Sequence, residues 1–171
     1  MCGQNDLRMR AEEFDELYSE HARPLLAFLT YRTGDPVEAE DLVAETFERV
    51  LRSRRRFDAR RASKKTWIYT IALNLLRDRA RRAAVGRRAT VPPAAEASAA
   101  DARLEQIETR AELADALGAL SPEERETVAL RYGADLTVPE IARVTGQRLS
   151  TVDGRLYRAL RKLHSSLTQT D

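Results

Sequence analysis

The sequence has little cysteine, glycine, proline or aromatic character. Its single cysteine, Cys2, cannot form an intrachain disulfide, and with no second cysteine nearby it makes a poor metal site. No stretch approaches the ~20 apolar residues of a membrane span, and residues 1–13 lack the apolar core of a signal peptide. These absences predict a cytoplasmic protein that does not insert into membranes. They also favour an all-helical fold without a metal or a cofactor.

Charged residues are abundant and almost balanced, with 29 basic and 27 acidic side chains. Their distribution is uneven, because eight basic residues lie in the segment 52–65, where Asp58 is the only acid. Trp67 and Tyr69 follow directly. Positive charge binds a phosphate backbone, and exposed aromatic rings stack on unpaired bases. The same run is also compatible with an ordinary solvated surface, and Trp67 shares a helical face with Ile71, which favours its burial.

Helical spacing of apolar residues predicts three helices in the first half of the chain. The first carries apolar residues over 14–29 and ends at Gly34. The second begins at residues 35–38, where the letters DPVE place an acid at the N-cap, proline at the first helical position and glutamate at the third. The third spans about 63–82.

Composition changes after the third helix. Alanine, proline and small polar residues dominate residues 85–103, and no apolar periodicity remains. Such a segment cannot bury enough apolar surface to order itself, so we expect a flexible linker. The sequence therefore predicts an all-α protein of two small helical domains, residues 8–84 and 104–171, joined by the linker 85–103.

The second half of the chain contains several helix-start signals a short distance apart. After a helix expected over 104–120, residues 121–124, 137–140 and 150–153 each have a serine or threonine followed three positions later by an acid. This is the pattern of a capping box. Gly146 is placed to end the helix that starts at 137–140. The signals predict several short helices in a compact bundle.

The segment 139–163 has the spacing of a helix-turn-helix. Such a motif needs a small residue where its helices approach, a glycine in the left-handed turn and an apolar residue where the second helix packs back. Ala142, Gly146 and Val152 meet these needs. A recognition helix places its N-terminal residues on base edges and its basic residues on phosphates. A capped helical hairpin with a basic, solvated face is the alternative for this segment, although the pattern favours the helix-turn-helix.

Three groups of residues form a recognisable combination. They are EDLVAETF at 40–47, WIYTIALNLLRD at 67–78, and LSPEERE, LRY, EIA, TV and RLYRA between 120 and 159. In this order they resemble the polymerase-binding helix, the promoter-melting helix and the C-terminal domain of bacterial RNA polymerase sigma factors of the extracytoplasmic-function (ECF) group. The resemblance covers nearly the whole chain, from about residue 14 to residue 167.

The resemblance implies a non-enzymatic subunit that brings core RNA polymerase to promoter DNA, melts the DNA and starts transcription. Residues 8–84 would correspond to sigma region two and residues 104–171 to region four. Polymerase binding is expected at Asp41, Leu42, Glu45 and Phe47. Contact with the minus-ten element is expected at Arg52, Arg54, Arg55, Arg56, Arg60, Arg61, Lys64, Lys65, Trp67, Asn74 and Arg77. Contact with the minus-thirty-five element is expected at Arg148, Ser150, Thr151, Asp153, Arg155, Tyr157, Arg158 and Arg161. The free protein is expected to be a monomer, and the resemblance leaves open whether an anti-sigma factor binds it.

The sequence departs from the family's usual pattern at a few positions. Ala44 stands where glutamine is usual, Lys64 where an aromatic residue is common, and Asp153 and Gly154 where a basic residue and serine are usual. Asp153 either completes a capping box with Ser150 or reads a base, since a carboxylate can accept a hydrogen bond from a cytosine amino group.

Two other functions are compatible with parts of the sequence. A dimeric helix-turn-helix activator acting without polymerase explains the second half, but it leaves residues 40–47 and the basic segment without a role. A nucleic-acid enzyme needs clustered carboxylates or a metal site. Acidic residues do cluster over 35–45, but at a helix start they serve capping and partner contact.

Overall fold

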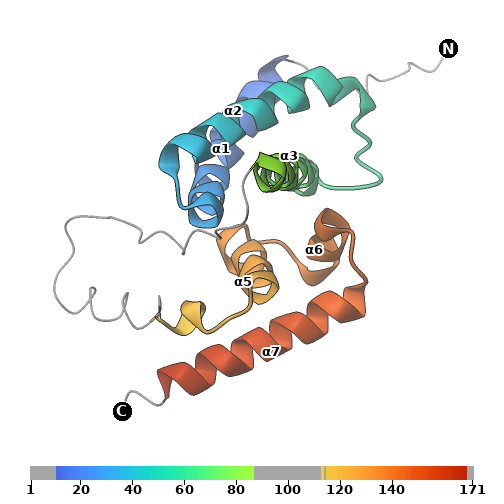
Figure 1. The fold of residues 1–171 in the computed structure, drawn as a ribbon. Coiled ribbons are helices and arrows are strands. Elements are labelled where there is room, and N and C mark those ends of the chain that lie inside the picture. The colour runs from blue at the N-terminus through green and yellow to red at the C-terminus, as the bar shows by residue number, and fades with distance from the viewer. Residues whose placement is uncertain (1–10, 87–112, 114, 169–171) are drawn as a thin grey trace, which may run out of the picture.

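The computed structural model describes residues 11–86, 113 and 115–168 (Figure 1). The N-terminal half contains α1 (Ala11–Thr33), α2 (Pro36–Ser53), the 3-10 helix η1 (Arg54–Arg56) and α3 (Lys64–Gly86). The C-terminal half contains α5 (Pro122–Val128), the π-helical turn η2 (Ala129–Gly133), α6 (Val138–Thr145) and α7 (Leu149–Leu167). The described residues include no strand, and the predicted all-α fold is confirmed. Residues 87–103 of the expected linker, and most of the helix expected over 104–120, lie outside the described residues.

The three long N-terminal helices pack on one another around an apolar core. Gly34 has a left-handed conformation (φ 72°) between α1 and α2, and Asp35 caps α2 by accepting from the backbone N–H groups of Val37 (2.9 Å) and Glu38 (3.4 Å). Pro36 takes the first helical position, where a missing N–H leaves no hydrogen bond unmade. The predicted start of α2 is therefore confirmed. The fully buried apolar side chains of this half include Leu25, Leu29, Leu42, Val50, Ile68 and Leu73.

Two capping boxes start the short helices of the C-terminal half. Ser121 and Glu124 exchange hydrogen bonds between side chain and backbone at the start of α5, and Thr137 and Glu140 do the same at the start of α6. Gly146 ends α6 in a left-handed conformation, with φ 69°. These features match the sequence-based expectations because each depends on residues only a few positions apart.

Helix α7 begins earlier than the sequence indicates. Its N-cap is Arg148, and no side chain accepts a capping hydrogen bond there. Ser150 lies inside the helix at its second position, so the capping box expected between Ser150 and Asp153 is wrong. Asp153 is an exposed residue at the start of the second turn.

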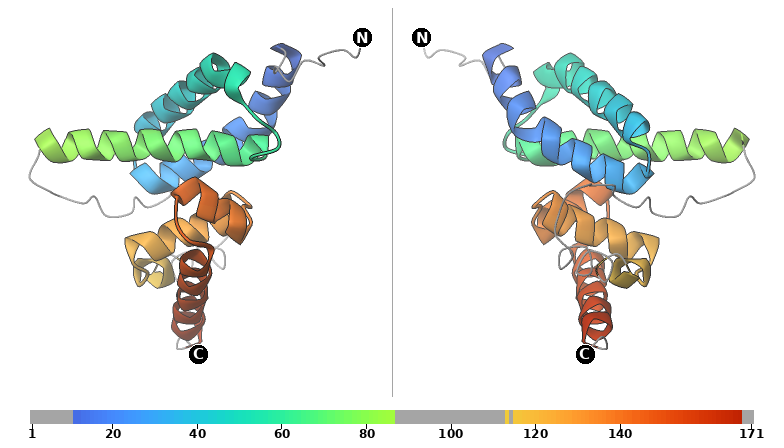
Figure 2. Two further views of the ribbon diagram at one scale, coloured as in Figure 1. Left: turned by 90° about the vertical axis from the view of Figure 1, so that its right-hand side faces the viewer. Right: turned by 90° about the vertical axis from the view of Figure 1, so that its left-hand side faces the viewer.

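The two halves of the chain pack against each other. α3 contacts α6, α1 contacts η2, and apolar side chains of both halves, among them Leu25, Leu130 and Ile141, belong to one cluster. Figure 2 shows α5, η2 and α6 between the three N-terminal helices and α7. The surfaces that the sequence assigns to different tasks are therefore held in one compact arrangement.

Candidate nucleic-acid interface

The structure divides the four expected polymerase contacts on α2 into two pairs. Leu42 and Phe47 lie in the core with exposed fractions of 0% and 3%, and the Phe47 ring contacts the ring of Tyr18 at a centroid separation of 4.7 Å. Asp41 is exposed and Glu45 is half-exposed. In this conformation Leu42 and Phe47 hold α2 in place, and their side chains are not available to a partner.

The exposed face of α2 includes apolar side chains that were not predicted as polymerase contacts. Val37 is 68% exposed and Leu51 is 39% exposed, and Asp41, Ala44 and Glu48 are exposed between them. Steps of four and three positions place these residues along one stripe of the helix. The spacing could be read from the sequence, but buried and exposed apolar residues of α2 could not be separated without the packing.

Glu45 connects α2 to α3. Its carboxylate pairs with Arg49 one turn along α2 at 2.9 Å and with Arg79 of α3 at 3.2 Å. Partly exposed pairs of this kind contribute little stability. They do fix the direction of the Glu45 side chain beside the stripe.

The basic segment after α2 lies at the surface. Its exposed basic residues are Arg52, Arg55, Arg56, Arg60 and Arg61. Arg54 is partly exposed in η1, and Phe57 and Trp67 stack in a tilted arrangement with ring centroids 4.9 Å apart. Trp67 packs against the core, as its helical spacing indicates, and keeps part of its surface exposed. Exposed guanidinium groups and a partly exposed aromatic pair therefore belong to the same loop and the start of α3, and binding of an unpaired strand uses groups of both kinds.

The remaining minus-ten candidates extend along α3. They are Lys64, Lys65, Asn74 and Arg77. Asn74 is exposed, whereas Lys65 and Arg77 contact acidic residues of the C-terminal half. At ~1.5 Å per residue, Lys64 and Arg77 lie about 20 Å apart. The structure therefore does not gather the whole set at one point, and its distal members belong to a long edge of α3.

Helix α7 presents the expected recognition surface. Helices α6 and α7 pack against each other, Ala142 of α6 and Val152 of α7 are 9% and 0% exposed, and Gly146 forms the left-handed turn, so the helix-turn-helix is confirmed. The expected minus-thirty-five residues that are exposed are Arg148, Ser150, Thr151, Asp153, Tyr157, Arg158 and Arg161.

Two basic residues of α7 are held by partners within the protein. Half-buried Arg155 donates from Nη1 to Oε1 of Gln147 in the turn, at 2.6 Å. Lys162 Nζ donates to Oε2 of the buried Glu124 at 2.7 Å, and this hydrogen bond lowers the pKa of the Glu124 carboxyl. No sequence pattern points to Gln147, because its contact with Arg155 spans eight positions and depends on the conformation of the turn.

Gly154 meets no geometric need for glycine. A Cβ added there would lie 3.5 Å from Arg158 Nη1, which is an ordinary van der Waals distance.

Acidic and histidine side chains are spread over the described residues. Among the described residues no three His, Cys, Asp or Glu side chains are grouped to hold a metal ion. His21 is buried in α1, with its Nε2 3.8 Å from Oε2 of Glu20. Over the described ranges, no helix is long and apolar enough to cross a membrane.

Comparison with known proteins matches both halves of the chain. The family model for sigma-70 region 2 matches residues 17–85, and the model for sigma-70 region 4 matches residues 110–163. The chain is 31% identical to ECF RNA polymerase sigma factor SigL of Mycobacterium tuberculosis over 159 residues, covering 90% of this chain and 88% of that protein. It is 34% identical to ECF RNA polymerase sigma factor BldN of Streptomyces coelicolor over 158 residues, covering 90% of this chain. It spans only 60% of the length of BldN and 62% of that of SigE of Mycolicibacterium smegmatis.

Two solved structures have a similar fold. The sigma factor RpoE of Bartonella quintana, in complex with the anti-sigma factor NepR, superposes with a TM-score of 0.70 at 22% identity, covering 92% of this chain and 98% of that one. CnrH, in complex with the cytosolic domain of CnrY, superposes with a TM-score of 0.66 at 26% identity, covering 95% of this chain and 91% of that one.

Proposed function

Because this chain belongs to the family of ECF RNA polymerase sigma factors, we propose that it is a promoter-recognition subunit of RNA polymerase that acts in the cytoplasm. The observation that carries the proposal is that one chain joins an exposed helical stripe, an exposed basic loop and a helix-turn-helix. A dimeric activator uses only the last of these. The subunit itself performs no catalysis, since the polymerase makes the RNA.

The polymerase contact in this proposal is the exposed stripe of α2. Val37 and Leu51 supply apolar ends, and Asp41 and Glu48 supply charge between them. An apolar contact with a polar, charged surround is typical of a helix that binds another protein. Asp41 and Glu45 keep the direct role that the sequence suggested, and Leu42 and Phe47 act by supporting the helix.

The minus-ten contact in this proposal is the basic loop with the first turns of α3. A base that leaves the duplex needs a surface to receive it, and the phosphates of the displaced strand need cations. Trp67 offers the partly exposed ring, and Arg55, Arg56 and Arg60 offer exposed guanidinium groups. The minus-thirty-five contact is α7, with Thr151, Tyr157 and the neighbouring arginines in the major groove.

An inhibitory partner is also part of the proposal. The solved relative RpoE is held by the anti-sigma factor NepR, and we extend such a partner to this chain. A protein of this kind would be found by its co-purification with the full chain and by its loss from the complex when core polymerase is added.

Run-off transcription tests the main proposal. The full chain is mixed with core polymerase and genomic promoter fragments, and discrete transcripts that depend on the chain are expected. Size-exclusion chromatography supplies the second arm. A sigma factor elutes as a monomer and co-migrates with core polymerase, whereas an activator elutes as a dimer and does not co-migrate. Dimerisation without co-migration, together with the absence of transcripts, would exclude the sigma-factor function.

A further inference from the structure

Asp153 on α7 has none of the structural roles that account for an acid near the start of a helix. Because α7 begins at Leu149, Asp153 is its fifth residue and lies past the first turn, within which the helix dipole favours an acid. The N-cap is Arg148 and Ser150 lies inside the helix, so Asp153 belongs to no capping box. The residues three and four positions away on either side are uncharged, so no cation pairs with Asp153 along the helix.

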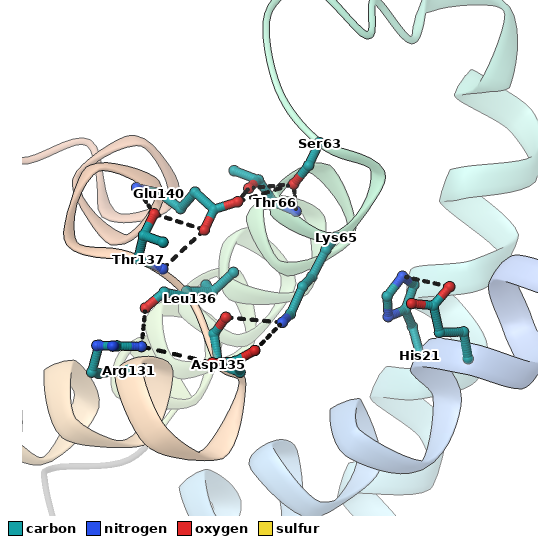
Figure 3. Close-up of polar contacts among 10 residues, drawn as sticks. His21, Ser63, Lys65, Thr66, Arg131, Asp135, Leu136, Thr137 and Glu140 are labelled. Carbon is teal, nitrogen blue, oxygen red and sulfur yellow. Dashed lines mark hydrogen bonds and ion pairs between the residues drawn. The ribbon is translucent and has the colours of Figure 1, made fainter.

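The other acidic side chains of α5 and the segments after it do have partners. The carboxylate of Asp135, which is also exposed, lies 3.6 Å from Lys65 Nζ and 3.7 Å from Arg131 Nη1 (Figure 3). The carboxylate of Glu140 is held in the capping box of α6, and the three glutamates of α5 each accept a hydrogen bond. Over the residues that the structure describes from α5 onward, Asp153 is the one acid whose side chain has no hydrogen bond or ion pair.

Asp153 lies on the exposed side of α7. The side chains that α7 buries are Val152, Leu156 and Ala159, and the helix contacts α5 and α6. A second row of residues follows at steps of three and four positions, and each of its members is exposed: Ser150, Asp153, Tyr157 and Leu160. α7 is the second helix of the helix-turn-helix, and the N-terminal half of such a helix meets base edges in the major groove. An unpaired carboxylate therefore stands in the row that would meet the bases.

A carboxylate discriminates among the four bases because it can only accept hydrogen bonds. In the major groove guanine presents the acceptors N7 and O6, thymine presents the acceptor O4, and adenine presents the acceptor N7 beside its amino group. Cytosine presents only the donor of its 4-amino group. A carboxylate beside any other base meets an acceptor, and a carboxylate beside a phosphate is repelled. Among base edges, Asp153 is therefore best placed opposite cytosine.

The residue after Asp153 suits a short side chain that has to reach a base. Gly154 lies two positions after the buried Val152, which is about 200° around the helix and therefore on its outer side. The fold does not require glycine there, because an added Cβ would make only an ordinary contact, 3.5 Å from Arg158 Nη1. Glycine permits the close approach of a backbone to a ligand. Gly154 thus allows α7 to come near enough to the bases for an aspartate to contact one.

We propose that Asp153 determines promoter choice by accepting a hydrogen bond from the 4-amino group of one cytosine in the minus-thirty-five element, and that it disfavours the other three bases at that position. This inference rests on the proposed function, because it takes α7 as the reader of that element. It also has a consequence for other sequences. On DNA that lacks the cytosine, the carboxylate lies near acceptors and phosphates without a donor, and it weakens binding.

The first measurement is a selection of bound duplexes from a pool randomised over the minus-thirty-five element. It uses the full chain, once alone and once mixed with core polymerase. The unchanged protein should select cytosine at one position. Asp153→Ala should lose the preference at that position, and Asp153→Asn should move it toward adenine, because an amide pairs with adenine N6 and N7. The control is Asp15→Ala, which removes an exposed aspartate of α1 with the same change of net charge and should keep the cytosine.

The second measurement removes the amino group of the base. In the selected duplex the cytosine is replaced by pyrimidin-2-one, which lacks the 4-amino group and keeps the rest of the ring. Fluorescence anisotropy should show that the unchanged protein loses about tenfold in affinity, whereas Asp153→Ala is unaffected. Compared with the unchanged protein, Asp153→Ala should bind the cytosine duplex more weakly and a duplex with guanine at that position more tightly. A change in net charge alone cannot produce opposite signs on two duplexes.

Three results would overturn the base contact. They are a selected sequence without cytosine, a cytosine preference that persists in Asp153→Ala, and equal sensitivity of both proteins to loss of the amino group. Asp153 would then be a solvated surface acid. Circular dichroism checks that the variants retain their helices, which we expect because Asp153 is exposed.

Run-off transcription with the unchanged protein tests the proposed function separately. If no transcript forms and the chain does not join core polymerase, but the chain alone still selects cytosine through Asp153, the proposed function fails and the base contact stands. If transcripts form while Asp153→Ala selects the same sequence as the unchanged protein, the proposed function stands and the base contact fails. A chain that selects no sequence in either arm would overturn both.

Discussion

Arg155 on α7 and Gln147 in the preceding turn are joined by a 2.6 Å hydrogen bond from the guanidinium to the side-chain carbonyl. The bond ties the side chain of a residue expected at the DNA to the turn that orients α7. It gives Arg155 one preferred direction before DNA arrives, and a pre-ordered side chain loses less freedom on binding.

Gln147→Ala should therefore weaken binding to a target minus-thirty-five duplex. Ordering a long side chain on binding costs about 0.5–1.5 kcal/mol, so we expect a loss of ~1 kcal/mol, about fivefold in affinity. Arg155→Ala in the same assay gives the upper limit. Equal affinity of Gln147→Ala and the unchanged protein would show that the bond does not prepare Arg155.

Gly154→Ala should stabilise the protein. Gly154 is helical and has room for a Cβ, so alanine should raise the free energy of unfolding by about 0.5–1 kcal/mol. Gly146→Ala is the matched opposite change, because φ is +69° at Gly146, and it should cost roughly 1–2 kcal/mol. Urea unfolding of both variants measures the difference, and a loss of stability in Gly154→Ala would contradict the open geometry around that residue.

Stability should fall in acid because of His21. Burial lowers the pKa of this imidazole below its ordinary value of 6.5, while Glu20 raises the pKa and Lys65 lowers it. With a lower pKa in the folded state, the unfolded chain binds the proton more readily, so protonation favours unfolding. The free energy of unfolding should be insensitive to this group well above pH 6.5 and should decrease as the pH falls below 6.5.

The variant His21→Gln isolates that effect, because glutamine does not titrate. Denaturation curves of the two proteins, collected from about pH 8 to about pH 5.5, should show a shallower acid loss in the variant even if it is less stable throughout. Parallel curves would assign the acid loss to other groups.

Polymerase binding should depend on the exposed stripe of α2. Leu51→Asp and Asp41→Arg should weaken binding of core polymerase by about 2 kcal/mol if either is a central contact, which is roughly thirtyfold in affinity. The control is the buried neighbour Leu42. Leu42→Ala should lower the free energy of unfolding by about 2–5 kcal/mol. The molecules of this variant that remain folded should bind core polymerase with normal affinity. Normal affinity in both stripe variants would move the polymerase contact elsewhere.

The basic loop should matter more for strand opening than for duplex binding. Replacing Arg54, Arg55 and Arg56 together by alanine removes phosphate contacts that only the displaced strand is expected to make. Permanganate footprinting on a promoter found by run-off transcription should show fewer reactive thymines, while closed complexes persist. Equal loss of closed and open complexes would indicate that these arginines contact the phosphates of duplex and single-stranded DNA alike.

Several features follow from the sequence because they are local. Asp35-Pro36 starts α2, Ser121 and Thr137 start α5 and α6, and Gly146 ends α6, each through contacts within about one helical turn. Each motif that indicates the family is also a short run of residues, so it can be recognised without the structure. The cap expected at Ser150 is wrong, because α7 already begins at Leu149 and Ser150 therefore lies inside the helix.

Tertiary packing decided what the sequence could not. Leu42 and Val37 are both apolar residues of α2, but contact with α1 and α3 buries the first, and the second stays 68% exposed. The pairs Lys65–Asp135, Thr66–Glu140 and Arg77–Glu126 join residues 49 to 74 positions apart. Spacing along a helix fixes which residues share a face, whereas the burial of that face, and the partner of each charge, depend on how distant helices pack. For this reason the sequence by itself determined the helices and the family, and only the tertiary structure placed acidic residues of one half on the basic edge of the other.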